Sequence, residues 1–263
     1  MRKPWLTLIG DYDRSQRAAG RSTGTIRLHR HYLLGLAELA PEPQGITLPV
    51  LEQFLSNPTW APETRKSARA AVRGFCRWMY GRGLIEHDPS DTLPSVRVPA
   101  GVARPTPEHL VRQLVAASDR IGTMAMLAAY CGLRRGEIAR VHRRDLVGEE
   151  LLIHGKGGKV RAVPILSADL LRRIQSADDW LFPNGLDGHL TPGHVGKLLS
   201  ASMPEGWTAH TLRHRMASVS YAATRDLLAV GEVLGHSRPE TTQRYIRLPR
   251  DAVRDAVRAA SAA

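Results

Sequence analysis

A small set of polar residues in the C-terminal half of the sequence has the side chains that cleavage of a phosphodiester needs. They are two arginines, two histidines, a tyrosine and a lysine: Arg134, Arg213, His210, His236, Tyr245 and either Lys156 or Lys159. Two guanidinium groups can bind the non-bridging oxygens of a phosphate and stabilise the charge that its transition state adds. A tyrosine can attack phosphorus once a histidine or nearby cations help to remove its proton, because its ordinary pKa is about 10. A lysine or a histidine can then protonate the departing 5′ oxygen.

The product of such an attack is a phosphotyrosine ester. The ester keeps the energy of the broken bond, so a second hydroxyl can reverse the attack without ATP or a metal ion. The sequence agrees with this chemistry, because it has neither the Gly-x-x-x-x-Gly-Lys-Ser/Thr phosphate loop nor a carboxylate or Cys/His set with the spacing of metal ligands. His210 and His214 are four positions apart, but the glutamate of a zinc protease helix is missing between them. We therefore expect no cofactor and no metal.

The first arginine stands between two predicted helices. Residues 122–130 are small and apolar, which predicts a buried helix that ends at Gly132. Arg134 and Arg135 follow at the start of the next helix. One step along a helix turns a side chain by about 100°, so only one of these two guanidinium groups can face a cleft.

The remaining candidates lie on later helices. His210 and Arg213 are three positions apart, so they share one face of a predicted helix. His236 follows a glycine that ends the helix predicted before it. The sequence SRPE at 237–240 is a capping box, which predicts a new helix that carries Tyr245.

The clear β signal is a hairpin with lysines at its turn. Residues 151–153 and 160–165 predict two strands, and the Gly-Gly pair between them suits a two-residue turn. Such a turn would place Lys156 and Lys159 opposite each other, where either can reach a ligand. The alternative is a pair of lysines that only keep the surface soluble.

Charge points to the class of partner. The formal net charge of +12 favours a polyanion, most simply nucleic acid. Residues 59–80 predict a helix with an apolar stripe beside a basic face, which consists of Arg65, Lys66, Arg69 and Arg73. No carboxylate stands at these turns of the helix to pair with the face, so we predict that it contacts phosphates in a DNA groove, whereas the alternative is a face that is merely solvated.

A proline-rich stretch at 88–107 divides the chain, since it has few periodic apolar residues and reads as an extended linker. We predict domains at 1–95 and 106–263, the second ending in a tail helix, with a linker at 96–105. Cys76 and Cys131 lie among apolar helical residues, which indicates reduced thiols. Neither a signal sequence nor an apolar run of about 18 residues occurs, so we expect a cytoplasmic protein without membrane contact.

Taken in order, the motifs resemble those of the tyrosine recombinase, or phage integrase, family. The resemblance rests on GLRRGEI at 132–138, GKGGKVRAVP at 155–164, HTLRH at 210–214, LGHS at 234–237 and TTQRY at 241–245. By this resemblance the catalytic residues are Arg134, Lys156, His210, Arg213, His236 and Tyr245. The arginines hold the phosphate, the lysine is the general acid, the histidines surround the phosphate and the tyrosine is the nucleophile. Lys159 then becomes a DNA contact and His214 a structural residue.

The resemblance also implies a fold and a partner. The fold is mainly α: an N-terminal helical core-binding (SAM-like) domain precedes a mixed, mostly α catalytic domain with a small antiparallel β-sheet, and the two form a clamp on DNA. Residues 1–95 would bind the core site. Such proteins act as homotetramers on double-stranded attachment or core sites. They exchange strands through a Holliday junction, and the C-terminal helix is expected to dock on a neighbouring protomer rather than on its own domain.

Three functions remain open at this point. Because the chain starts directly with the predicted core-binding helices, we expect no arm-binding domain. Our main interpretation is a phage or prophage integrase that cuts and rejoins DNA through a 3′-phosphotyrosine intermediate. The first alternative is a Xer-type resolvase of chromosome or plasmid dimers. The alternative from another class is a non-catalytic DNA-binding accessory protein of the same fold, and the full catalytic set argues against it.

Overall fold

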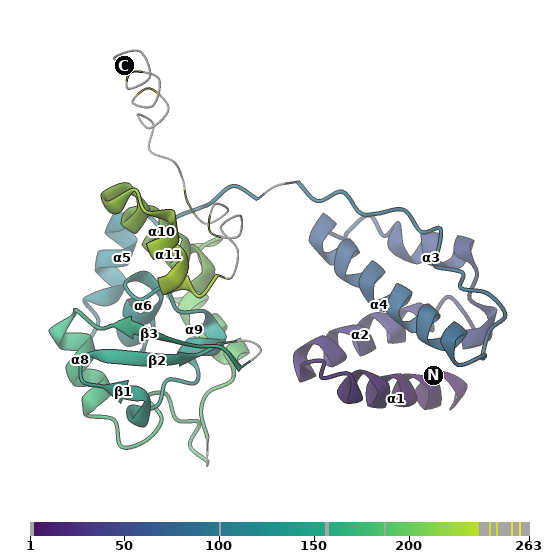
Figure 1. The fold of residues 1–263 in the computed structure, drawn as a ribbon, viewed down its shortest axis with the longest axis horizontal. Coiled ribbons are helices and arrows are strands. Elements are labelled where there is room, and N and C mark those ends of the chain that lie inside the picture. Colours follow the sequence, from purple (N-terminus) through teal and green to yellow (C-terminus); the bar gives the residue numbers. More distant parts are fainter. Residues whose placement is uncertain are drawn as a thin grey trace. The chain divides into compact units, whose positions relative to one another are not determined.

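The chain divides into two compact units, Met1–Ala100 and Gly101–Ala263 (Figure 1). The computed structural model describes residues 3–99, 101–155, 158–186 and 188–236, together with 242, 246, 254 and 258. The assignment of a DNA-binding domain to 1–95 and a catalytic domain to 106–263 stays a prediction.

The first unit is a group of helices around an aromatic core. Its elements are α1 (Lys3–Ala18), α2 (Thr23–Leu36), the short 3₁₀ helix η1 (Pro43–Gly45), α3 (Leu48–Leu55) and α4 (Pro62–Gly81). Ser22 caps α2, because its Oγ accepts a hydrogen bond from the backbone N of Thr25 at 3.3 Å. The rings of Trp5 and Phe75 stack with 5.7 Å between their centroids, which fixes α1 against α4.

The second unit surrounds a central apolar helix. Its elements are α5 (Glu108–Val115), α6 (Arg120–Ala129), the single turn α7 (Arg135–Ile138), the 3₁₀ helix η2 (Arg143–Asp145), β1 (Leu146–Val147), β2 (Glu150–His154), β3 (Val160–Pro164), α8 (Ala168–Gln175), α9 (Pro192–Ala201), α10 (Ala209–Thr224) and α11 (Leu227–Leu234). Every residue of α6 from Gly122 to Ala129 is buried, as its small apolar residues predict. Helices α5, α8, α9 and α10 all contact α6, so these four helices are positioned around it.

The described strands form an antiparallel sheet in the order β1-β2-β3. In the hairpin His154 pairs with Val160, so residues 155–159 connect the strands. Lys159 lies opposite Gly155, whose N–H donates to the Lys159 carbonyl at 2.7 Å. The prediction of a two-residue Gly-Gly turn, with Lys159 opposite Lys156, is therefore wrong.

Alternating burial explains the observed register. Leu151 and Ile153 are the buried residues of β2, and Arg161 and Val163 are those of β3. The register pairs Ile153 with Arg161 and Leu151 with Val163, so buried residues face the same side of the sheet. A shift of the register by one residue would turn one of these sets of buried side chains toward solvent. The lost burial outweighs the preference of the Gly-Gly sequence for a two-residue turn.

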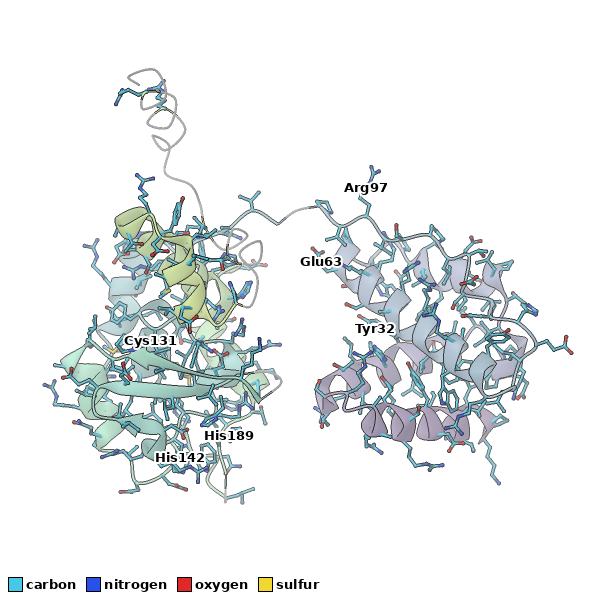
Figure 2. All side chains as sticks on the ribbon, in the orientation of Figure 1. Tyr32, Glu63, Arg97, Cys131, His142 and His189 are labelled. Carbon is cyan, nitrogen blue, oxygen red and sulfur yellow. The ribbon has the colours of Figure 1, made fainter. Side chains whose placement is uncertain are left out.

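The fold is thus mainly helical, with a helical N-terminal unit and a second unit that adds a small antiparallel sheet, as the sequence predicts. Cys131 lies within the second unit and Tyr32 within the first (Figure 2). Cys76 and Cys131 are buried free thiols, and burial raises the pKa of each to about 12, so both stay protonated. No helix of the described residues is long and apolar enough to cross a membrane.

Candidate active site

Arg213 of α10 lies at the centre of the site and is only 1% exposed. Its guanidinium donates to the carbonyl of Gly132 after α6, to the carbonyl of Leu234 at the end of α11 at 2.7 Å, and to Nε2 of His236 at 3.0 Å. A buried charge needs such hydrogen bonds to offset its loss of water. Arg213 therefore ties the segment after α6 and the end of α11 to α10.

Two glycines bring these carbonyls within reach of Arg213. Gly132 has a φ of 66° and Gly235 a φ of 64°, which is the left-handed region that glycine adopts without strain. A Cβ at Gly132 would lie 2.9 Å from Cδ2 of Leu234, and a Cβ at Gly235 would lie 2.9 Å from Nη1 of Arg161. Gly235 ends α11, as the sequence predicts. Both positions therefore require glycine for conformation and for space.

Arg134 precedes α7 and is held by Glu137 in the same turn. Its Nη1 donates to Oε1 of Glu137 at 2.8 Å, and its backbone N donates to Oε2 at 2.9 Å. The side chain of Arg134 is 40% exposed, so part of its guanidinium still meets solvent. Arg135 lies against α9 instead, where a Cβ at Gly196 would be 3.6 Å from its Cδ. The two neighbouring arginines thus point to different surroundings.

Glu137 is the buried carboxylate that joins the arginines. Nη1 and Nη2 of Arg161 donate to it at 3.2 Å and 2.9 Å, and Nη1 of Arg213 lies 3.9 Å from its Oε2. Desolvation raises the pKa of Glu137, but the hydrogen bonds from Arg161 and Arg134 outweigh it and lower the pKa to about 2. One ionised carboxylate therefore links arginines from α7, β3 and α10.

His236 lies between Arg213 and Thr242. A guanidinium can only donate, so Nε2 of His236 accepts from Arg213. Nδ1 then carries the ring proton and donates to Oγ1 of Thr242 at 3.0 Å. Burial, followed by the charges of the nearby arginines, Arg213 first, lowers the pKa of His236 to about 4. The ring is neutral at neutral pH, with its unprotonated nitrogen on the side of Arg213.

His210 stands in the first turn of α10, where Thr208 caps the helix. Its ring meets that of His214 edge to face, with 4.5 Å between the centroids. Desolvation of the ring, followed by the charges of His214 and Arg213, lowers the pKa of His210 to about 4. The residue as a whole is exposed, so solvent screens part of this effect. The charges of Arg134 and Arg135 act in the same direction.

The structure therefore brings several of the predicted catalytic residues together. Arg134, Arg213 and His236 lie in one hydrogen-bonded cluster around Glu137, and His210 shares a helix with Arg213. Lys156, Tyr245 and the capping box at 237–240 lie outside the described residues. Lys159 is described and exposed, at the end of the hairpin connection. The catalytic roles of all these residues stay predictions.

Sequence reasoning missed three residues of this cluster: Glu137, Arg161 and Thr242. Arg161 occupies a buried position in an alternating strand, and a cation at such a position signals a buried partner. Glu137 follows Arg134 by three residues, the spacing at which an acidic side chain reaches back to the start of a helix. Thr242 gave no comparable signal, because a hydroxyl residue six positions after a histidine does not indicate a contact between the two.

Two arginines of the predicted basic face on α4 are bonded within their own unit. Nε of Arg65 donates to the carbonyl of Leu55 at 2.8 Å, and Nη2 of Arg69 donates to the carbonyl of Leu93 at 2.5 Å. Burial lowers the pKa of Arg69, with a further contribution from the neighbouring charge of Arg73. These hydrogen bonds stabilise the first unit and reduce the number of donors left for a phosphate.

The other two residues of the face differ. Arg73 lies 4.0 Å from Asp91, a carboxylate from outside the helix, so one member of the face has an acidic partner that the turns of the helix do not supply. Both side chains are partly or largely exposed, which keeps such a pair weak. Lys66 is exposed. Contact of the face with DNA stays a prediction.

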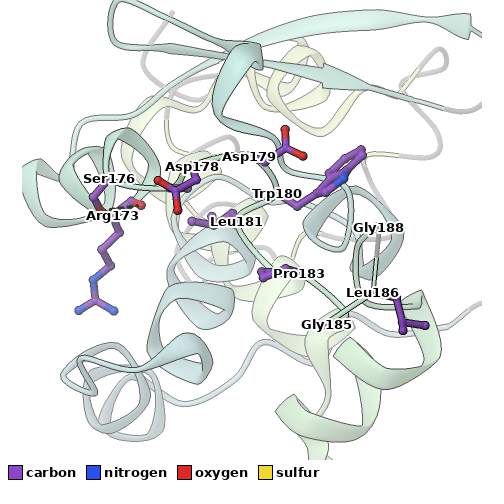
Figure 3. Close-up of a pocket in the computed structure, with 11 residues that line it drawn as sticks. Arg173, Ser176, Asp178, Asp179, Trp180, Leu181, Pro183, Gly185, Leu186 and Gly188 are labelled. Atoms are coloured by element: carbon purple, nitrogen blue, oxygen red, sulfur yellow. Dashed lines mark hydrogen bonds between the residues drawn. The ribbon is translucent and has the colours of Figure 1, made fainter.

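A separate cavity of about 540 Å³ lies elsewhere in the second unit (Figure 3). Its lining comes from residues between Arg173 and Gly188, including Asp179 and Trp180, and contains none of the predicted catalytic residues. In the part of the chain that the structure describes, no group of three or more His, Cys, Asp or Glu side chains is placed to hold a metal ion.

The sequence profile of the phage integrase family matches residues 106–251, which is more than half of the chain. The chain belongs to the phage integrase family. It is a tyrosine recombinase, an enzyme of site-specific DNA recombination. It is 34% identical over 215 residues to the tyrosine recombinase XerC of Chromohalobacter salexigens, an alignment that covers 72% of this chain and 70% of the relative. It is 30% identical over 269 residues to XerD of Caulobacter vibrioides, covering 88% and 87%.

Solved structures share the fold of this recombinase. A lambda integrase dimer bound to a COC′ core site matches with a TM-score of 0.74 and 16% identity, covering 91% of this chain and 76% of the other. The XerH site-specific recombinase bound to a palindromic difH substrate matches with a TM-score of 0.69 and 21% identity, covering 92% and 81%. At these identities the match concerns the fold alone.

Proposed function

We propose that this recombinase is of the Xer type: it cuts and rejoins two DNA duplexes at a specific site and so resolves dimers of a chromosome or plasmid. Relatives named tyrosine recombinase XerC and XerD support the proposal, and the XerD relative aligns with 88% of this chain. The phage integrase interpretation, which the sequence analysis puts first, has less support. Its solved counterpart, lambda integrase, is 16% identical and resembles this chain in fold.

The position of Arg213 carries the catalytic proposal. This buried guanidinium lies 3.0 Å from Nε2 of His236 and shares Glu137 with Arg134, whose side chain is 40% exposed. The donors are thus fixed before any substrate binds. Fixed donors stabilise the extra negative charge of a phosphoryl transition state without having to reorganise during the reaction.

The proposed reaction exchanges the phosphodiester bond of DNA for a phosphotyrosine ester. Oη of Tyr245 attacks phosphorus, a bond forms between the tyrosine and the 3′ phosphate, and the bond to the 5′ oxygen breaks. Lys156 gives the departing oxygen its proton, and one of the two histidines beside the phosphate, His210 or His236, accepts the proton of the tyrosine. The 5′ hydroxyl of a partner duplex then attacks the phosphotyrosine and reverses these steps, so no ATP is needed.

Double-stranded core sites are the proposed partner, and a homotetramer is the proposed assembly. A solved lambda integrase tetramer bound to a Holliday junction shares the fold with a TM-score of 0.71. Residues 1–95 would bind the core site and 106–263 would carry out catalysis. Exchange of the C-terminal helix between protomers concerns residues that lie mostly outside the described part of the chain.

Covalent capture tests the proposed activity. Cells that express the protein are lysed under denaturing conditions, and the DNA that remains attached to the protein is sequenced to find the site. A nicked duplex of that site is then incubated with the purified protein. Wild type is expected to form a covalent adduct on a denaturing gel, whereas Tyr245→Phe binds the duplex without forming one. Tyr130→Phe, at the end of α6, is the matched control and is expected to cleave normally. A wild type that never forms an adduct would support the non-catalytic accessory protein.

The captured site also distinguishes the two recombinase roles. A plasmid with two direct repeats of one captured site is expected to resolve into two circles if the chain is of the Xer type. Recombination that occurs only between two different sites would support the integrase instead.

A further inference from the structure

Thr242 lies against His236 in the buried part of the site. It is 1% exposed, and its Oγ1 is 3.0 Å from Nδ1 of His236. Thr242 also approaches α11 closely, because a Cβ at Gly231 would lie 3.1 Å from Oγ1. The absence of a side chain at Gly231 therefore leaves space for the Thr242 hydroxyl beside His236.

Arg213 and Thr242 together determine which nitrogen of His236 carries the proton. Nη2 of Arg213 is 3.0 Å from Nε2, and a guanidinium has no acceptor. Nε2 is therefore the unprotonated nitrogen of the neutral ring, and Nδ1–H donates to Thr242. A hydroxyl at position 242 accepts the hydrogen bond from Nδ1–H, whereas a methyl group in its place could not accept it.

We propose that Thr242 is a positioning residue that keeps His236 in the Nδ1-protonated form, with Nε2 directed to Arg213. The proposal rests on the proposed function, in which His236 is one of the catalytic histidines. Thr242 precedes Tyr245 by three residues in the sequence, and its hydrogen bond to His236 joins position 242 to the arginine cluster.

The charges around His236 make the choice of nitrogen important. The ring faces Arg213 of α10, Arg134 before α7, Arg161 of β3 and the carboxylate of Glu137. Desolvation and then these three arginines lower the pKa of His236 to about 4, against the opposing effect of Glu137. The ring is neutral at neutral pH and has one N–H, so Nε2 can accept from Arg213 and Nδ1 can donate to Thr242 only in the Nδ1-protonated form.

Matched substitutions separate the hydroxyl from the shape of Thr242. Thr242→Val removes the hydroxyl, and Thr242→Ser keeps it. Thr123→Val is the control, because Thr123 is 5% exposed and its hydroxyl also makes hydrogen bonds. It donates to the carbonyl of Asp119 at 3.0 Å and accepts from Nη1 of Arg173 at 2.9 Å, neither of which belongs to the arginine cluster. We expect Thr242→Val to form the covalent adduct about ten-fold more slowly in single turnover, as one lost hydrogen bond implies. DNA affinity is expected to stay unchanged, and the other two variants to stay within about two-fold of wild type.

The ¹⁵N chemical shifts of His236 report the tautomer without any cleavage. In protein without DNA, wild type and Thr242→Ser are expected to show a protonated Nδ1, and Thr242→Val to lose this pattern. An Nε2-protonated wild type, or a Thr242→Val variant that cleaves at the wild-type rate, would overturn the proposal, as would a Thr242→Ser variant as slow as Thr242→Val. If wild type forms no adduct at all, the proposed function fails, and the tautomer measurement still decides whether Thr242 holds the ring.

Discussion

Arg161 of β3 and Glu137 of α7 form a buried ion pair, with 2.9 Å between Nη2 of the arginine and Oε2 of the carboxylate. Their side chains are 7% and 4% exposed. Glu137 also accepts a hydrogen bond from Arg134 and lies 3.9 Å from Arg213. One carboxylate thus offsets the charges of three arginines, two of which are proposed to bind the phosphate.

This arrangement predicts unequal effects of removing the two partners. Glu137→Gln leaves Arg161 and Arg213 buried without their shared counter-charge, so we expect the free energy of unfolding of the second unit to fall by about 3–5 kcal/mol. Arg161→Met is expected to cost less, because Glu137 keeps Arg134 and Arg213 as partners. Calorimetry of the full chain measures both losses, with Glu150→Gln on the exposed end of β2 as the control. Equal losses in the two variants would contradict the account.

Acid is expected to destabilise the second unit through Glu137. Desolvation raises its pKa, but the hydrogen bonds from Arg161 and Arg134 outweigh it and lower the pKa from 4.5 to about 2. The folded carboxyl binds its proton less tightly than the unfolded one. Its contribution is therefore fully present above the unfolded pKa and is lost as the pH falls toward the folded pKa.

The predicted pH window is between about 4.5 and 2, and the loss is about 3 kcal/mol at most, since one pKa unit corresponds to about 1.4 kcal/mol. Melting temperatures of wild type and Glu137→Gln across this window provide the measurement. Wild type is expected to lose stability more steeply than the variant. Parallel curves would show that Glu137 does not have the lowered pKa.

Gly235→Ala and Gly148→Ala form a matched pair of substitutions. Gly235 has a φ of 64° and Gly148 a φ of 62°, so alanine costs about 1–2 kcal/mol of backbone strain at each. A Cβ at Gly235 would also lie 2.9 Å from Nη1 of Arg161, whereas a Cβ at Gly148 meets nothing within 4 Å.

We therefore expect both alanine variants to melt earlier and only Gly235→Ala to form the covalent adduct more slowly. Displacement of Arg161 would shift the arginine cluster, and misplacement of a catalytic group by about 1 Å can slow a reaction on the order of a hundred-fold. Single-turnover cleavage at a temperature where both variants are folded provides the comparison. An equal loss of cleavage in both variants would mean that backbone strain alone is responsible.

The basic face of α4 predicts different roles for two neighbouring residues. Lys66 is exposed, so Lys66→Ala is expected to weaken DNA binding and to reduce the salt dependence of log Kd by about one counterion, without loss of stability. Arg65 donates to backbone carbonyls of its own unit, so Arg65→Ala is expected to lower the melting temperature of the first unit. Binding titrations at several salt concentrations, together with calorimetry, distinguish the two. A Lys66→Ala variant that binds like wild type would remove Lys66 from the proposed DNA contacts.

Local signals in the sequence predicted the elements of the site well. The small apolar residues of α6, the glycine that ends α11 and the three-residue spacing of His210 and Arg213 all depend on neighbours along the chain, and each feature is present in the structure. Arg134, Arg213 and His236 of the cluster were found because several motifs occur in one order, since no single histidine or arginine identifies its own partner.

The remaining features depend on contacts between distant residues. Arg161 and Glu137 are brought together by the strand register, which the predicted Gly-Gly turn gave incorrectly because a turn sequence says nothing about which face of each strand is buried. Arg65 and Arg69 read as free cations in the sequence, although the fold supplies carbonyls to both. Such carbonyl partners cannot be recognised from residue types.

The central claim is that Tyr245 becomes covalently attached to the 3′ phosphate of the cleaved strand. Protease digestion of the adduct trapped on the nicked duplex, followed by mass spectrometry, identifies the attached residue. The account predicts a nucleotide linked through phosphate to Tyr245, in the peptide that contains TTQRY at 241–245. Attachment to any other residue, or an adduct of unchanged yield from Tyr245→Phe, would contradict it.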